Sequence, residues 1–395
     1  MNGPSDIVMG ANAGRSRSHN RQVVLARVRA AGKIGRAEIA RASGLSTQAV
    51  SNIIAELVAD GLIVERGHRA GARGLPVAQY ALNPSGGVAA GLEIRPDAVV
   101  GTLMDLGGSR RASLRRALPA PDRDTVTDTV RALRAELLAT SRTPAARVLG
   151  TGLVMPGPFA PTGLRGSASD LPLWDEIPPE RWFADALGGP VLIENDANAA
   201  AIAERVCGVA HGLDTYAFVY FGAGLGLGIV QEGRLLTGAH GNAGEIGHIP
   251  VPAAGGALPL EDAVSRLSVQ RALEAQGLRV GSVDDLAALH RAGHPALADW
   301  LDAATGPLTA AIAIVENLFD PETVILGGAM PDGILDQLVA AVRLPERSVS
   351  ARPGRTVPRL MRGASGRMTA TLGAAALVVN QLFTPGLAVR GEAPR

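Results

Sequence analysis

Four polar side chains lie near the start of a predicted helix that runs from Ser46 to about Asp60. Its buried stripe is predicted from apolar residues at helical spacing, namely Val50, Ile53, Ile54, Leu57 and Val58. The polar residues that this stripe turns outward are Thr47, Gln48, Ser51 and Asn52. Glutamine and asparagine can pair bidentately with adenine, and serine and threonine can hydrogen-bond to phosphates or bases. Because the first turns of a recognition helix enter the major groove, the pattern favours contact with DNA.

Two shorter helices are expected before this one. Residues 20–31 mix apolar and basic side chains in a helical period that ends at Gly32. Residues 36–42 form a second short helix, which Gly44 ends, and Ser46 is placed to cap the third. This order of elements predicts a helix-turn-helix.

A wing is expected after the third helix. Residues 62–67 and 77–83 have the composition of two strands, and the turn between them carries Arg69 and Arg73. Arginines in such a turn could reach the DNA backbone or the minor groove. We therefore predict a winged helix-turn-helix over residues 19–83, which either binds DNA or serves protein contacts alone.

The charge distribution supports DNA as the partner. Residues 1–86 carry 11 Lys and Arg against 5 Asp and Glu, a balance of +6, which leaves 27 against 32, a balance of −5, for the remainder of the chain. A basic head on an acidic body is expected when one module meets a polyanion and the other does not. The alternative is a solvated, arginine-rich surface.

Composition excludes several classes of protein. With 395 residues and 47% hydrophobic residues, the chain can form two or three domains with their own cores. A single cysteine, Cys207, excludes an internal disulfide and a zinc site built from several thiolates of one chain. No stretch is long and apolar enough for a membrane span, and the N-terminus lacks the apolar core of a signal peptide. We expect a cytoplasmic location.

Beyond a short linker at residues 84–87, strands alternate with helices, so residues 88–384 should form an α/β domain. The predicted strands are residues 88–94, 99–105, 148–154, 191–194, 215–221, 226–231 and 323–326. The predicted helices include residues 197–206, 300–319 and 369–382. A strand, tight turn and strand occur twice, which suggests a duplication and the two-lobed architecture of actin and hexokinase, in which the two turns hold nucleotide phosphates. The ends, residues 1–18 and 385–395, are predicted to be disordered tails.

Five segments of this region occur in the order and spacing typical of one family. They are ENDANAAAIAE (194–204), GAGLGLGIV (222–230), GNAGEIGHIPV (241–251), NLFDPETVILGG (317–328) and LGAAAL (372–377). In combination they resemble the ROK family of repressors and sugar kinases, and the head resembles the winged helix of ROK repressors. The resemblance covers about residues 20–384.

The resemblance implies a sugar site. The residues that match the family's sugar-binding positions are Asn195, Asp196, Glu245, His248 and Glu261. Carboxylates can accept from neighbouring hydroxyls, and an amide offers both a donor and an acceptor, so such a site selects polyols. Each residue also has a simpler interpretation, because Asn195 or Asp196 could merely cap the next helix and GNAGEIGH could be a turn with a solvated Glu and a core His.

Two departures from the family pattern argue against catalysis. Where ROK kinases carry Asp, an apolar residue, two glycines and Thr in the first hairpin turn, this chain has Glu93-Ile94-Arg95-Pro96-Asp97. Proline removes a backbone donor and Asp97 adds negative charge, so the turn is poorly suited to ATP phosphates, and Asp196 would be only the vestige of a kinase base. The segment from Pro252 to Glu261 lacks the family's zinc-binding cysteines. We expect no metal, no ATP and no catalytic residue.

These inferences converge on a sugar-responsive transcriptional regulator. We expect a homodimer or homotetramer that binds operator DNA and represses carbohydrate genes until a sugar relieves it, although the sign of the response cannot be derived from the residues. An active sugar kinase with an attached DNA-binding head is the alternative. A third possibility is a DNA-binding protein whose body binds no sugar and only mediates assembly.

Overall fold

The chain consists of two compact units. The computed structural model describes residues 13–70, 76–157, 178–253 and 256–384. Unit 1 comprises residues 1–87 and 379–395, and unit 2 comprises residues 88–378. The boundary after Gly87 follows the 3₁₀ turn Pro84–Gly86, inside the predicted linker.

Unit 1 also includes the last described residues of the chain, which the sequence assigned to the second domain. The Arg29 guanidinium lies 4.5 Å from the centre of the Phe383 ring, and the Gln22 side-chain amide donates to the carbonyl of Gln381 over 3.0 Å. A cation over an aromatic face and an amide–carbonyl bond are both stabilising contacts. They explain why residues 379–384 group with the head.

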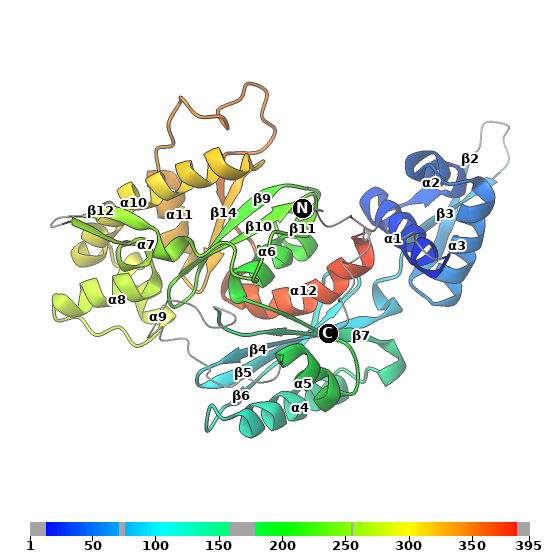
Figure 1. Cartoon of the computed structure of the whole chain (residues 1–395), viewed down its shortest axis with the longest axis horizontal. Coiled ribbons are helices and arrows are strands. Elements are labelled where there is room, and N and C mark those ends of the chain that lie inside the picture. The colour runs from blue at the N-terminus through cyan, green and yellow to red at the C-terminus, as the bar shows by residue number, and fades with distance from the viewer. Residues whose placement is uncertain (1–12, 71–75, 158–177, 254–255, 385–395) are drawn as a thin grey trace, which may run out of the picture. The chain divides into compact units, whose positions relative to one another are not determined.

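Unit 1 is the predicted winged helix-turn-helix (Figure 1). Its elements are α1 Ala13–Ala31, β1 Ile34–Gly35, α2 Arg36–Ser43, α3 Thr47–Ala59, β2 Ile63–Ala70 and β3 Pro76–Leu82. The three strands form an antiparallel sheet in the order β1-β3-β2. Gly32 and Gly44 follow α1 and α2 with positive φ angles of 68° and 71°, as the predicted helix ends require.

Two details of the head correct the prediction. Helix α1 begins at Ala13, so residues 13–18 are helical and not part of a disordered tail. Its early turns are held by ion pairs that sequence spacing does not reveal, since Arg17 and Arg21 both bind Glu56 of α3. Val58 was placed in the buried stripe of α3 but is 42% exposed.

Unit 2 contains two five-stranded sheets with the same topology (Figure 1). The first has the order β6-β5-β4-β7-β8, from β4 Val88–Arg95, β5 Ala98–Asp105, β6 Arg110–Ala117, β7 Val148–Val154 and β8 Val191–Glu194. The second has the order β11-β10-β9-β14-β15, from β9 Tyr216–Phe221, β10 Leu225–Gln231, β11 Arg234–Leu235, β14 Val324–Gly328 and β15 Leu360–Arg362. In each sheet an antiparallel meander is followed by two parallel strands. The repeated topology confirms the predicted duplication and the two-lobed fold.

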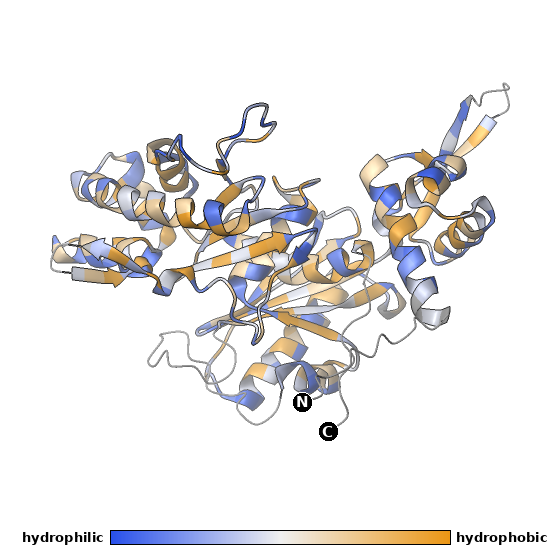
Figure 2. Cartoon of the chain, turned by 45° about the horizontal axis from the view of Figure 1, so that its top comes forward, coloured by the Kyte–Doolittle hydropathy of each residue, from blue (hydrophilic) through white to orange (hydrophobic). Residues whose placement is uncertain are grey.

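Helices and a small hairpin complete unit 2. In the first lobe they are α4 Arg123–Thr140 and α5 Pro179–Leu187. In the second lobe they are β12 Pro250–Ala253, β13 Gly256–Pro259, α7 Leu260–Ala263, α8 Arg266–Ala275, α9 Val283–Arg291, α10 Pro295–Phe319 and α11 Asp332–Ala341. The strands of both sheets are coloured mainly as apolar residues in Figure 2, consistent with sheets covered on their faces. None of the described helices is long and apolar enough to cross a membrane.

Two helices rich in small residues pack closely against the sheets. They are α6 Asp196–Cys207 and α12 Thr369–Phe383. A Cβ atom on Gly91 of β4 or on Gly152 of β7 would clash with the backbone of α12, and one on Gly228 of β10 would clash with the backbone of α6. One on Gly373 of α12 would clash with the carbonyl of Ala199 in α6. The glycines and alanines in these segments therefore serve close backbone packing.

A buried carboxylate anchors the C-terminal end of α6. Glu204 is 1% exposed and accepts hydrogen bonds from the backbone amides of Val209, Ala364 and Ser365 at 2.8–3.2 Å. Residues 364–365 lie in the segment that leads into α12. The carboxylate thus ties α6 to the approach to α12.

Replacing Glu204 by Gln is expected to destabilise unit 2 by roughly 2–4 kcal/mol, because an amide group would turn donors toward backbone N–H groups that need an acceptor. Thermal or urea unfolding followed by circular dichroism measures the change. Glu346→Gln, at an exposed position, is the control. A Glu204→Gln protein as stable as this control would contradict the anchoring role.

Candidate functional site

The outer face of α3 presents the predicted DNA-reading residues. Thr47, Gln48 and Asn52 are exposed, and Ser51 is half-buried. The Gln48 amide donates to the Asn52 side-chain oxygen over 3.1 Å, so the two side chains lie together on the helix surface. Ser46 caps the helix, since its hydroxyl oxygen accepts from the amide of Ala49 over 3.2 Å.

The wing differs from the prediction in the position of its arginines. Arg69 lies within strand β2 rather than in the turn, and its guanidinium pairs with Glu38 of α2 over 2.9 Å. Arg73 lies outside the described residues. Arg66, also on β2, was not singled out by sequence reasoning, but it is exposed and forms no ion pair within the described part of the chain. An isolated arginine on a strand carries no sequence signature that would have identified it.

Asn195 and Asp196 lie where strand β8 gives way to α6. The Asn195 side-chain oxygen accepts from the amide of Asn198 over 2.7 Å and caps the helix, as the simpler interpretation expected. Asp196 accepts from the amide of Ala197 through one carboxylate oxygen, over 2.9 Å. Its other oxygen, Oδ2, would lie 3.3 Å from a Cβ placed on Gly222. Asp196 therefore lies beside the turn that joins β9 to β10.

Glu245, His248 and Glu261 form a second group. Glu245 precedes the 3₁₀ turn Ile246–His248, His248 is the last residue of that turn, and Glu261 lies in α7. The imidazole Nε2 of His248 is 3.6 Å from Glu245 Oε2, and its Nδ1 is 4.0 Å from Glu261 Oε1. All three side chains are about one-third exposed, so their polar atoms remain accessible.

The β9–β10 turn joins the two groups into one site. Glu261 lies against Gly224 of this turn, and Asp196 lies against Gly222. The structure thereby brings four of the five predicted residues around one glycine-rich turn, with Asn195 next to them in sequence. Side chains on either glycine would crowd the carboxylates.

Burial and neighbouring charges alter the protonation of this cluster. Desolvation raises the pKa of Asp196 from its ordinary value of 3.8 to about 7, and the carboxylates of Glu93 and Glu245 add to the effect. Desolvation also raises the pKa of Glu245, with a further contribution from Glu261 and an opposing one from His248. Near neutral pH, Asp196 can therefore act as either a hydrogen-bond donor or an acceptor.

The first hairpin turn of unit 2, between β4 and β5, lies near the same site. Glu93 is buried, and Arg95 binds it through two parallel hydrogen bonds of 2.8 and 2.9 Å. The Thr371 hydroxyl of α12 donates to the same carboxylate. At the tip, Asp97 pairs with Arg115 over 2.6 Å.

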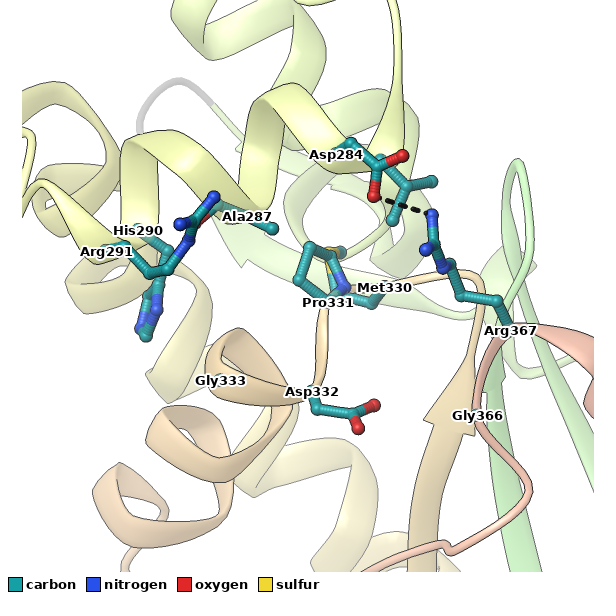
Figure 3. Close-up of a pocket in the computed structure, with 11 residues that line it drawn as sticks. Asp284, Ala287, His290, Arg291, Met330, Pro331, Asp332, Gly333, Gly366 and Arg367 are labelled. Atoms are coloured by element: carbon teal, nitrogen blue, oxygen red, sulfur yellow. Dashed lines mark hydrogen bonds and ion pairs between the residues drawn. The ribbon is translucent and has the colours of Figure 1, made fainter.

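A hollow of about 360 Å³ lies elsewhere in unit 2 (Figure 3). It is lined by residues of α9, the start of α11 and the turn before α12, and an ion pair of 3.0 Å joins Asp284 to Arg367 beside it. None of the five predicted sugar-binding residues lines this hollow. The candidate site is therefore defined by the cluster around Gly222 and Gly224.

The raised pKa of Asp196 predicts a pH-dependent effect of Asp196→Asn on stability. Between pH 3.8 and about 7 the folded state holds a proton that the unfolded chain releases, so the native protein loses stability as pH rises through this window. Asparagine does not titrate. The melting temperature of the variant, relative to the native protein, should rise up to about pH 7 and level off above it.

Asp299→Asn, at an exposed aspartate of α10, is the control for this experiment. Differential scanning calorimetry across the pH range measures both variants. A difference between Asp196→Asn and the native protein that does not change with pH would show that Asp196 has an ordinary pKa.

Relatives of the chain include both regulators and kinases. The chain is 28% identical to the uncharacterised protein y4fQ of Sinorhizobium fredii over 78% of each chain. It is 24% identical to the xylose repressor of Bacillus subtilis over 59% of this chain and 60% of that one. A crystal structure described as a ROK family transcriptional regulator, homologous to the E. coli MLC protein, matches with a TM-score of 0.75 and 24% identity over 94% of this chain and 98% of that one. The ROK hexokinase of Thermus thermophilus matches with a TM-score of 0.57 and 28% identity over 73% of this chain and 97% of that one.

Family profiles agree with the two units. The MarR family profile matches residues 22–74, within the winged helix of unit 1. The ROK family profile matches residues 89–381, nearly three-quarters of the sequence, and the chain belongs to the ROK family.

Proposed function

We propose that the protein is a sugar-responsive DNA-binding regulator that represses carbohydrate genes until a sugar binds. One observation carries this proposal: the chain combines two kinds of domain. The first is a MarR-type winged helix whose recognition face is polar and exposed, and the second is a ROK domain with a cluster of carboxylates and a histidine. One relative is described as a xylose repressor, and one solved structure is described as a ROK family transcriptional regulator. These descriptions support the proposal, but they do not identify which sugar this protein binds.

Unit 1 would bind DNA through α3 and the wing. The amides of Gln48 and Asn52 are the groups suited to reading base edges, and Thr47 and Ser51 are suited to phosphate or base contacts. Arg66 is the described wing residue whose guanidinium is available for the backbone, whereas Arg69 would first have to leave Glu38. A homo-oligomer would present two heads to a palindromic operator.

Unit 2 would bind the sugar at the cluster around the β9–β10 turn. Glu245 and Glu261 supply acceptors for hydroxyl groups, His248 carries one ring nitrogen that can donate and one that can accept, and Asp196 can do either near neutral pH. Asn195 already uses its side-chain oxygen as a helix cap, so its amide N–H groups remain for a ligand. A site with this many convergent polar groups favours a polyol.

Phosphoryl transfer is the alternative that the kinase relatives raise. Against it, Arg95 and Asp97 in the first hairpin turn are engaged by Glu93 and Arg115, and Pro96 offers no amide donor. We propose that the chain does not transfer phosphate and needs no ATP. ADP formation in the presence of ATP and hexoses would establish the kinase function instead.

The zinc site of the family does not fit this sequence. Residues 250–259 contain no Cys, His, Asp or Glu, and strands β12 and β13, which follow His248, lie in this segment. We propose that His248 serves the sugar and not a metal. In keeping with a regulator of transcription, we propose a cytoplasmic location.

Substituting Gln48 or Asn52 by Ala is expected to weaken specific DNA binding by about tenfold to a hundredfold, because each removes a bidentate base contact. Affinities are measured at one stated salt concentration, on a fragment selected from the upstream DNA of the gene. Gln270→Ala, on α8 of unit 2, is the matched control. If both head variants bind like this control, α3 is not the recognition helix.

A sugar that relieves repression must bind more weakly to the DNA-bound protein, typically by 1–3 kcal/mol of coupling. Sugar affinity is therefore measured with and without the DNA fragment, using a panel of hexoses and pentoses. Asp196→Ala should retain DNA binding without sugar and lose the response to sugar. Equal sugar affinities in the two conditions would refute the coupling.

A further inference from the structure

One side of helix α10 is apolar and exposed over most of its length. The helix packs on α7, α8 and α11 through its buried residues, and it lies at the outside of the second lobe (Figure 1). On the side that these contacts leave free, Ile314 and Leu318 are 45% and 69% exposed. Ala303, Gly306 and Ala310 precede them at helical spacing and are also exposed. These five residues form one continuous stripe, which we call the α10 face.

The α10 face lacks the charges that a solvated helix surface normally carries. Across residues 303–318 the only charged side chain is that of Glu316, which is buried and paired with Arg359. Thr309 and Asn317, on the flank of the face, both donate to carbonyls of their own helix over 2.7 Å. Single exposed apolar residues are common on proteins, whereas an uncharged stripe about four turns long indicates a contact surface.

The sizes of the side chains indicate that a second copy of the chain covers this face. Ile314 follows Ala310 by four residues, and Gly306 precedes it by four. An antiparallel pair of α10 helices, related by a two-fold axis at Ala310, therefore sets Ile314 of each copy against Gly306 of the other. Leu318 falls near Ala303 in the same way. A Cβ on Gly306 would meet no atom within 4 Å from the described parts of the chain beyond its own turn of helix, so there is room for the larger side chain.

Charges at the two ends of the helix fit the same arrangement. Asp302, next to the first residue of the α10 face, is exposed and forms no ion pair within the ranges that the structure describes. The segment of residues 343–359 carries five arginines and one acid, and Arg352 ties it to Asp320 at the opposite end of the helix. Arg347 of this segment is exposed and has no acidic partner among the described residues. Antiparallel pairing brings the acidic end of each helix to the basic segment of the other copy, whereas parallel pairing would not.

We propose that two copies of the chain assemble through the α10 face, with the helices antiparallel about a two-fold axis near Ala310. This inference rests on the proposed function in one respect, since a palindromic operator calls for two heads, and it names the surface that joins the two chains. Its tests involve neither DNA nor sugar. The interface and the sugar-responsive function can therefore fail separately.

The first test measures the mass of the full chain in solution by analytical ultracentrifugation over a range of concentrations. The native protein should be a dimer or a larger even-numbered assembly. Leu318→Glu places a charge in each half of the contact and should raise the dissociation constant at least about a hundredfold, so that the variant has half the native mass. Because Leu318 is largely exposed, circular dichroism should show an unchanged fold. Val209→Glu adds the same charge at another exposed apolar residue of unit 2 and should keep the native mass.

A cross-link tests the position of the two-fold axis. In a Cys207→Ser background, Ala310→Cys places one thiol of each copy beside the axis, where a disulfide can form. Mild oxidation should convert this variant to a covalent dimer. Ala298→Cys, exposed on the same helix, is the control. Its two thiols would lie about 36 Å apart in the antiparallel pair, so it should not cross-link.

Three results would overturn the proposal. A native protein that stays monomeric at every concentration would exclude a second copy as the occupant of the α10 face. A Leu318→Glu protein that keeps the native mass, as Val209→Glu does, would place the assembly surface elsewhere. Covalent dimers from Ala298→Cys but not from Ala310→Cys would contradict the antiparallel arrangement.

Discussion

Close backbone packing of two helices, α6 and α12, is the constraint on which unit 2 depends. The glycines of β4, β7 and β10 leave no room for a Cβ against these helices, and α6 and α12 meet each other at Gly373 and Ala199. Such contacts are sensitive to the addition of a single methyl group, because protein interiors are already close-packed. The alanine-rich sequence of α6 and the LGAAAL segment of α12 thus reflect a steric requirement at the centre of the domain.

This packing also sets the position of the candidate site. Since α6 is fixed against β10, its N-terminal residues Asn195 and Asp196 are held at the edge of the β9–β10 turn, where Glu261 arrives from α7. The carboxylates are consequently brought close together in a partly dehydrated place, and the raised pKa of Asp196 follows from that arrangement. Polar groups placed by rigid elements in this way are already organised before a ligand arrives.

The sequence predicted most of this fold because its strands are short apolar runs bounded by glycines. The predicted strands of unit 2 start within one residue of the observed ones, whereas β6, β11, β12, β13 and β15 were not predicted. Strand β6 was missed because its arginine-rich residues are largely exposed. The start of α1 was also missed, since its first turns depend on ion pairs with Glu56 from α3. Tertiary contacts of this kind leave no local pattern in the sequence.

The candidate site could be predicted only in part for the same reason. Asn195 and Asp196 are recognisable at the start of a helix, but their proximity to Glu245, His248 and Glu261 followed from family resemblance rather than from spacing. The pairing of Arg69 with Glu38 required the structure, because it depends on which residues of other elements lie nearby. A charged side chain has the same sequence letter whether it is paired or free.

The pairing of Glu93 with Arg95 limits how this hairpin can evolve. Glu93 is buried, so loss of Arg95 alone would leave a carboxylate inside the protein with the Thr371 hydroxyl as its remaining side-chain partner, which typically costs several kcal/mol. Loss of Glu93 alone would cost less, because the Arg95 side chain is 37% exposed and water can hydrate its guanidinium. In descendants of this sequence Arg95 should therefore change only together with Glu93 or after it.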